Sequence, residues 1–73
     1  MSWLKMKRDS YRKTQLEVAQ EADISLSFYS LIENNLRRPS PDVAKRIAKV
    51  LGFQDEWYRL LETKPVNPAS SKN

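Results

Sequence analysis

Residues 14–39 read TQLEVAQEADISLSFYSLIENNLRRP, and this stretch decides the fold. Thr14 and Glu17 have the spacing of a capping box, in which each side chain satisfies a free backbone N–H at the start of a helix. Ser25 can cap a second helix that follows after a short turn. Two such helices cross steeply only where a small residue permits close approach, and Ala19 occupies that place. The stretch therefore predicts a pair of short, crossed helices.

The ends of these two helices are marked by residues that tolerate a left-handed backbone. Asp23 adopts that conformation more readily than most residues and is expected to follow the end of the first helix. Asn34 and Asn35 are expected to end the second. Within the second helix, Tyr29 and Ile32 share one face, so we expect that face to dock on the first helix.

Further helix signals lie on either side of this pair. Ser2 can cap a helix at the N-terminus. Ser40-Pro41-Asp42 places a cap, a first-turn proline and a carboxylate suited to the helix dipole in order. Gly52 then supplies a left-handed C-terminal residue. We expect five helices, over about residues 3–11, 15–22, 26–33, 41–51 and 55–62.

Length and composition limit what the protein can do. A chain of 73 residues allows one domain with one hydrophobic core. It has no cysteine and no histidine, which removes disulfides, thiolate metal sites and nucleophile–imidazole pairs. We therefore expect no catalytic residues, metal ligands or cofactor. The net charge of +4 suits a polyanionic partner, and the lack of a long apolar run predicts a cytoplasmic protein rather than a membrane protein.

The chain divides into a folded part and a tail. Residues 1–62 carry all the helix signals and are expected to form the domain. Residues 63–73, TKPVNPASSKN, contain two prolines and one aliphatic residue. Such a segment has too little apolar surface to offset the entropy of ordering, so a flexible tail is expected.

The crossed pair resembles the helix-turn-helix of the Cro and phage-repressor family, also called the XRE family. The matching features, in chain order, are Thr14-Gln15, Ala19, Ile24-Ser25, Ile32-Glu33, Arg38-Pro39-Ser40, Ala48 and Leu51-Gly52-Phe53. The resemblance covers about residues 4–53 and places the motif at about 15–34. It implies an all-α, compact five-helix bundle of the lambda-repressor-like type. It also implies a sequence-specific transcription regulator of bacterial or phage origin, acting as a repressor on double-stranded DNA.

The resemblance also implies which residues touch DNA. In related proteins the third helix enters the major groove and the second lies across the phosphate backbone. Outward positions of the third helix would then contact bases: Leu26, Ser27, Ser30, Leu31 and Asn34. Polar and basic residues around both helices would contact phosphates: Arg12, Lys13, Gln15, Asn35, Arg37 and Arg38.

Several positions depart from the family pattern. Lys7 and Lys13 stand where relatives carry an aliphatic residue, and their alkyl stems are expected to lie along the core surface. Leu26 and Leu31 stand where base-reading polar residues are common, so we expect contact with thymine methyl groups. Glu33 is expected to pair with a nearby basic residue such as Arg38.

Two alternatives concern partners. A homodimer is expected through the last helix, with Trp57, Tyr58 and Leu61 as contacts, because two half-sites give useful specificity. The same fold could instead bind a regulatory protein partner, as an antirepressor or accessory factor does, through Leu26, Phe28, Leu31 and the exposed side of the last helix. The sequence leaves these open.

Overall fold

The computed structural model describes residues 3–62, and the expected all-helical fold is confirmed within that range. Its elements are α1 (Trp3–Ser10), α2 (Gln15–Glu21), α3 (Leu26–Glu33), α4 (Pro41–Val50), the 3-10 turn η1 (Gln54–Glu56) and α5 (Arg59–Glu62). The expected cap at Ser2 and the expected tail over 63–73 lie outside the described residues. Within the described part of the chain, no helix is long and apolar enough to cross a membrane.

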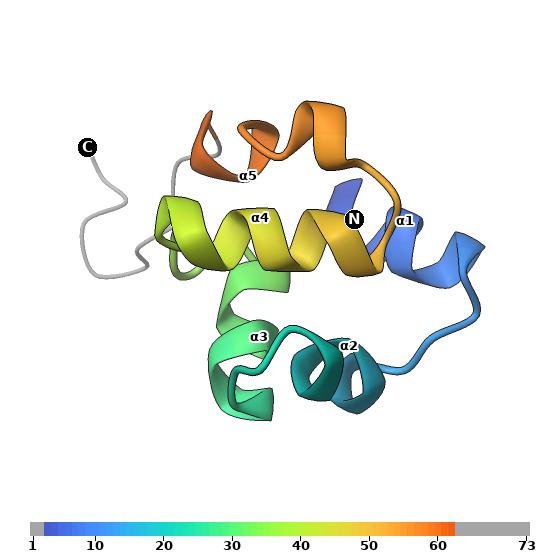
Figure 1. Cartoon of the computed structure of the whole chain (residues 1–73). Helices are drawn as coiled ribbons and strands as arrows, with labels where there is room; N and C mark the ends of the chain where they lie inside the picture. Colours follow the sequence, from blue (N-terminus) through green and yellow to red (C-terminus); the bar gives the residue numbers. More distant parts are fainter. Residues whose placement is uncertain (1–2, 63–73) are drawn as a thin grey trace.

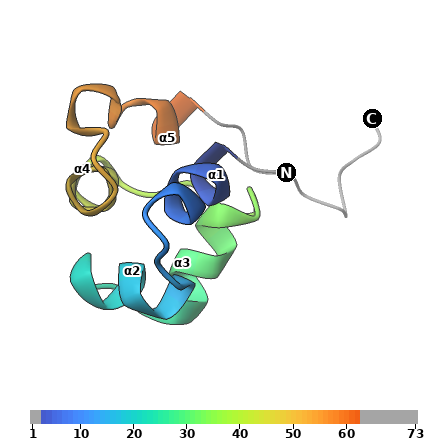
Figure 2. The ribbon, with the colours of Figure 1, turned by 90° about the vertical axis from the view of Figure 1, so that its right-hand side faces the viewer.

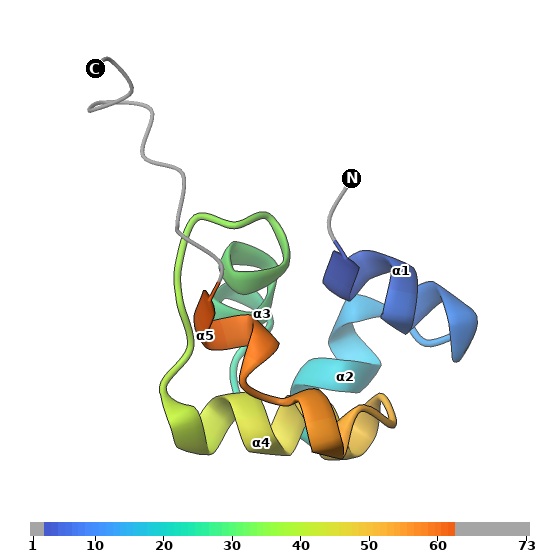
Figure 3. The same ribbon diagram turned by 90° about the horizontal axis from the view of Figure 1, so that it is seen from above.

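The helices pack around α4. In Figure 1, α4 runs between the α2–α3 pair on one side and the η1–α5 segment on the other. The view turned by a right angle (Figure 2) shows α1 between α5 and α3, so α1 closes the remaining side of the core. Seen from above (Figure 3), the chain passes over the C-terminal part of α4 and then leads away from that helix to α5. This arrangement leaves α2 and α3 together at one end of the molecule.

The predicted starts of α2, α3 and α4 are confirmed. The Glu17 N–H donates to the Thr14 hydroxyl over 3.1 Å, and the Thr14 N–H donates to the Glu17 carboxylate over 2.8 Å, which completes the capping box. The hydroxyls of Ser25 and Ser40 each accept from the backbone N–H three residues onward. A side-chain cap of this kind is worth about 1 kcal/mol. Local sequence therefore fixes where α2, α3 and α4 begin.

The predicted left-handed positions are also confirmed, and one was missed. Asp23, Asn35 and Gly52 have φ angles of 60°, 61° and 73°. Arg12, between α1 and α2, has a φ of 56° that the sequence did not indicate. At Gly52 a Cβ would collide with the ring of Tyr11, which packs on this turn. The positive φ is therefore the main reason for glycine at this position, because the half-exposed Tyr11 ring could move aside.

The core is a single cluster formed where the helices meet. Tyr29, Ile47 and Leu51 are its largest fully buried side chains, and Ala19, Ala44 and Ala48 are small and buried where helices approach closely. Trp3 and Phe53 contact edge to face, with ring centroids 4.8 Å apart, which joins α1 to the turn after α4. The core residues are Leu4, Val18, Ala19, Ala22, Tyr29, Ile32, Val43, Ala44, Ile47, Ala48, Leu51, Phe53 and Leu60.

The predicted last helix was wrong, and three other predicted helix ends differ from the structure by one residue. The segment 55–62 is not one helix: η1 ends at Glu56, and α5 begins only at Arg59. Residues 57 and 58 form the turn between them, which lets Leu60 reach the core while Trp57 lies against α4. The helices predicted over 3–11, 15–22 and 41–51 each end one residue earlier than expected, at Ser10, Glu21 and Val50.

Candidate nucleic-acid interface

The outward side of α3 carries both polar and apolar side chains. Leu26 is 44% exposed, and Ser27 and Asn34 are exposed as well. Ser30 and Leu31 are half-buried, so the predicted outward position of Leu31 holds only in part. Four of the five predicted base-contacting residues therefore lie on α3 and Asn34 caps its end, and Leu26, Ser27 and Asn34 are exposed.

Asn34 and Ser30 form a unit across one helical turn. The Asn34 Nδ2 donates to the Ser30 backbone oxygen over 2.9 Å and to the Ser30 hydroxyl over 3.3 Å. Within residues 3–62 the Asn34 Oδ1 accepts no hydrogen bond. A free amide oxygen can accept from the amino group of adenine or cytosine, so the Asn34 Oδ1 is available to accept a hydrogen bond of this kind.

A buried carboxylate fixes the inner side of the same helix. Glu33, at 3% exposed, accepts from Arg8 Nε over 2.7 Å and from Arg8 Nη2 over 3.2 Å. It also accepts from Gln15 Nε2 over 2.6 Å and from the Tyr29 hydroxyl over 2.9 Å. Arg8 Nη1 further donates to the Lys13 backbone oxygen over 2.7 Å. This Glu33 network, comprising Arg8, Gln15, Tyr29 and Glu33, joins α1, α2 and α3.

The network keeps Glu33 ionised. Burial alone would raise the pKa of the Glu33 carboxyl, but the hydrogen bonds from Arg8, Gln15 and Tyr29 outweigh it and hold the pKa below its ordinary value. The bond to Glu33 raises the pKa of Arg8, against its partial burial. Burial, followed by the nearby Glu33 charge, raises the pKa of Tyr29. The ion pair is therefore fully charged at neutral pH.

Two expectations about this region need correction or refinement. The partner that the structure gives Glu33 is Arg8, 25 residues earlier in the chain, rather than Arg38. Gln15 was predicted to contact phosphate, and its side-chain amide is already tied to Glu33. An amide nitrogen has two N–H groups, so the second can still donate to an anion beside the N-terminus of α2.

The predicted phosphate contacts lie on either side of α2 and α3. Arg12 is exposed in the link before α2, and Lys13 pairs with Glu21 over 2.9 Å. Arg37 and Arg38 are exposed in the loop after α3, which Asn35 opens. Backbone bonds from residues 36 and 37 to the Leu31 oxygen, over 2.8 and 3.2 Å, hold this loop against the end of α3. Cationic groups thus lie before α2 and after α3.

The predicted dimer residues divide by burial. Tyr58 is 46% exposed, whereas Trp57 and Leu61 are half-buried and pack against the core of the same chain. The core of the same chain therefore already buries part of Trp57 and Leu61, the side chains that we expected a second chain to cover.

Sequence reasoning missed two features. The Arg8 side chain is only 12% exposed and is the partner of Glu33, and the sequence analysis gave it no role. An inward-facing arginine together with an inward-facing glutamate was the available signal. Basic residues on α4, Lys45, Arg46 and Lys49, also line a pocket that received no prediction. No group of three metal-ligating side chains occurs among the described residues.

The chain was compared with known proteins. A family model described as "Helix-turn-helix" matches residues 4–58. An uncharacterized HTH-type transcriptional regulator, YqaF of Bacillus subtilis (strain 168), is 47% identical over 60 residues, which cover 82% of this chain and 76% of that protein. No solved structure matches.

Proposed function

The chain belongs to the helix-turn-helix family of DNA-binding transcription regulators, and from this premise we propose that α3 enters the major groove of an operator and acts there as a repressor. The observation that carries this proposal is the accessibility of Leu26, Ser27 and Asn34 on a helix whose opposite side is fixed by the core. A recognition helix needs both properties, because base contacts are specific only when the helix is held rigidly.

Base reading by this helix would combine apolar and polar contacts. Leu26 can touch a thymine methyl group, and Ser27 can donate to or accept from a base edge. Asn34 would accept from an amino group through its Oδ1. Within α3 there is no arginine for the bidentate contact to guanine, so the preferred operator should be rich in adenine and thymine at the contacted positions.

Phosphate contacts would set the register on DNA. Arg12 and Arg37 lie exposed on the two sides of the motif, and the N-terminus of α2 carries the Gln15 amide. Backbone N–H groups at a helix start favour anions. These contacts, with Lys13, Asn35 and Arg38, would position α3 without carrying sequence information.

Pairing of two chains would supply the remaining specificity. One recognition helix reads a single short half-site, and two half-sites about one helical turn apart require a dimer. Tyr58, with the exposed parts of Trp57 and Leu61, is the surface we assign to this contact. Repression would follow because a dimer of this kind covers promoter DNA that polymerase needs.

Selection of bound sequences from a random duplex pool tests the proposal directly. We expect enrichment of an inverted repeat with adenine and thymine at the contacted positions. Ser27→Arg should change the selected sequence while leaving the helical circular dichroism intact. Exposed Gln20→Arg, on α2, should raise affinity without changing the sequence. Recovery of no preferred sequence from the wild-type protein would contradict the proposal.

A further inference from the structure

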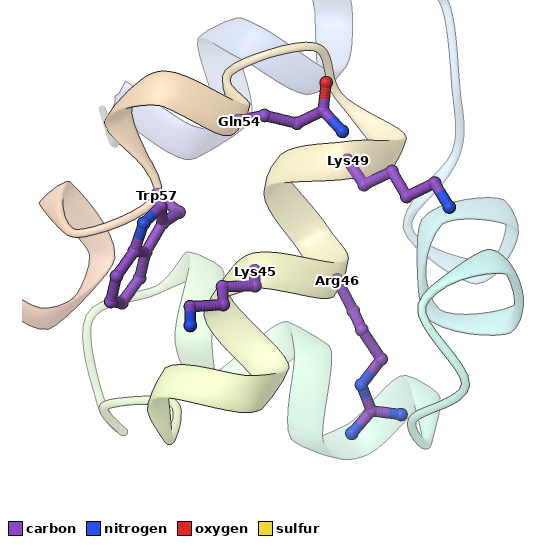
Figure 4. A pocket seen from close by; sticks show the side chains of 5 residues that line it. All are labelled: Lys45, Arg46, Lys49, Gln54 and Trp57. Carbon is purple, nitrogen blue, oxygen red and sulfur yellow. The ribbon is translucent and has the colours of Figure 1, made fainter.

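A shallow pocket lies on the exposed side of α4, between that helix and η1 (Figure 4). Its volume is about 360 Å³. This basic pocket is lined by Lys45, Arg46, Lys49, Gln54 and Trp57. Its residues come from α4, η1 and the turn that follows η1, and none comes from α2 or α3, so it is separate from the proposed DNA-reading surface.

The three cations of the basic pocket differ in how they are neutralised. Arg46 is engaged, because its guanidinium lies 3.1 Å from the Asp42 carboxylate and 3.7 Å from that of Asp23. Lys45 and Lys49 have no carboxylate within ion-pair distance among residues 3–62. They stand four residues apart along α4, a spacing at which like charges repel. Figure 4 shows their side chains leading to opposite sides of α4, so an extended acidic segment, rather than one small anion, would reach both ammonium groups.

The walls of the pocket are apolar below this charged rim. The Lys45 ammonium lies 4.7 Å from the centroid of the Trp57 ring, a cation–π arrangement that holds the lysine beside the indole. Figure 4 shows the Trp57 ring standing on one side of α4, with Lys49 and Gln54 toward the other end of the helix segment. A ligand that fits would place an apolar group against the indole and carboxylates at the lysines.

We propose that the basic pocket docks an acidic segment of a partner protein, one in which carboxylates flank an aromatic or aliphatic side chain. Charge complementarity selects this occupant, since the rim offers two ammonium groups and one amide donor over an apolar wall. Because the pocket shares no element with α3, the partner can bind while α3 is on DNA. This goes beyond the proposed function, and the docking itself needs no DNA.

The test uses a labelled acidic decapeptide, built from glutamates around one central phenylalanine, with fluorescence anisotropy as the readout. A second peptide carries glutamine in place of every glutamate. We expect the acidic peptide to bind and the glutamine peptide to bind at least about tenfold more weakly. Lys45→Glu/Lys49→Glu should weaken the acidic peptide by at least about tenfold, which corresponds to about 1.4 kcal/mol.

A matched control separates the pocket from overall charge. Lys5→Glu/Lys7→Glu, on α1, changes the net charge by the same amount at a distant surface and should leave most of the affinity intact. In a Trp3→Phe background, Trp57 is the single remaining tryptophan, and its emission should shift when the peptide binds. Circular dichroism checks that each variant folds.

Three results would overturn the proposal. Equal losses in the two double variants would mean that only net charge matters. Equal binding of the glutamine peptide would remove the carboxylates from the interaction. Exclusion of the peptide when the protein is saturated with its selected DNA site would assign the pocket to phosphate. Failure of DNA selection alone would sink the proposed function and leave peptide docking standing.

Discussion

The inner side of α3 carries Tyr29, Ile32 and Glu33, each at most 4% exposed, whereas its outer side carries Leu26, Ser27 and Asn34 in the open. The inner side is held by four hydrogen bonds to one carboxylate as well as by packing. The outer side has only a local link between Asn34 and Ser30. One helix thus has an inner side that groups from three helices hold in place and an outer side whose exposed side chains are the proposed base contacts.

The largest expected effect follows from removing the buried carboxylate on the inner side of α3. Glu33→Ala should destabilise the domain by about 3–5 kcal/mol, because it leaves the Arg8 guanidinium without its buried partner. Chemical denaturation of the wild type and the variant measures this difference. The matched control is Asn34→Ala, one residue away on the outer side, for which we expect a change within about 0.5 kcal/mol. Similar losses of stability at the two positions would contradict the conclusion that the inner side of α3, and not the outer side, holds the helix in place.

A gentler way to weaken the inner side is to lower the pH. The pKa of Glu33 in the folded protein lies below its ordinary value of 4.5, so the unfolded chain binds more protons in acid. The stability that Glu33 contributes is therefore complete above about pH 4.5 and is lost as the pH falls through its folded pKa. Asp9 and Glu17, whose pKa values are also lowered, add to the same slope.

Unfolding free energies measured across acid pH check this expectation. The wild-type curve should be flat near neutrality and should decline below about pH 4.5. Glu33→Gln should start from a lower stability and decline less steeply, because the group that titrates is gone. A variant whose slope in acid equals that of the wild type would show that Glu33 is not the coupled group.

How well the sequence predicted each side follows from how local the signals are. Caps at Thr14, Ser25 and Ser40 act within three residues, and they were all predicted correctly. The Arg8–Glu33 pair joins residues 25 positions apart, and although helical spacing places Arg8 on the same face as Leu4, no local rule names its partner. Sequence reasoning therefore placed the helices and missed the contact that orients them.

The C-terminal segment was mispredicted for a related reason. Spacing favoured one helix over 55–62. In the structure Leu60 is buried in the core while Trp57 stacks on Lys45 of α4, and the chain turns between these two contacts. Tertiary contacts of this kind override the weak propensity of a short segment. The candidate base contacts were predicted from helical geometry and family resemblance, but these did not predict that Leu31 is half-buried at the point where the following loop bonds to its backbone oxygen.

The proposed base contacts on the outer side of α3 can be tested by removing thymine methyl groups from the DNA. If Leu26 contacts such a methyl, replacing that thymine by uracil in the selected operator should cost about 1 kcal/mol, on the scale of one buried methylene. Leu26→Ala should bind more weakly and should lose its sensitivity to uracil, because the penalty belongs to the pair. Titrations of the four protein and DNA combinations give the coupling directly.

The uracil experiment also decides between DNA and protein as the occupant of this side. A wild-type protein indifferent to uracil at every contacted position would favour the alternative in which Leu26, Phe28 and Leu31 bind a regulatory protein. Repair of affinity when thymine is restored would confine the effect to the methyl group.

The smallest expected effect lies at the edge of the outer side, where Arg37 follows α3. Arg37→Ala should weaken all DNA sequences alike and should flatten the slope of log affinity against log salt by about 0.9, the loss of one phosphate contact. Lys5→Ala removes the same charge from α1, outside the proposed interface, and should leave the slope nearly unchanged. Binding measured at several salt concentrations, on the selected site and on random duplex, separates the two variants. A change in sequence preference with an unaltered slope would mean that Arg37 contacts bases rather than phosphate. Base contacts would then extend past α3 into the loop that follows it.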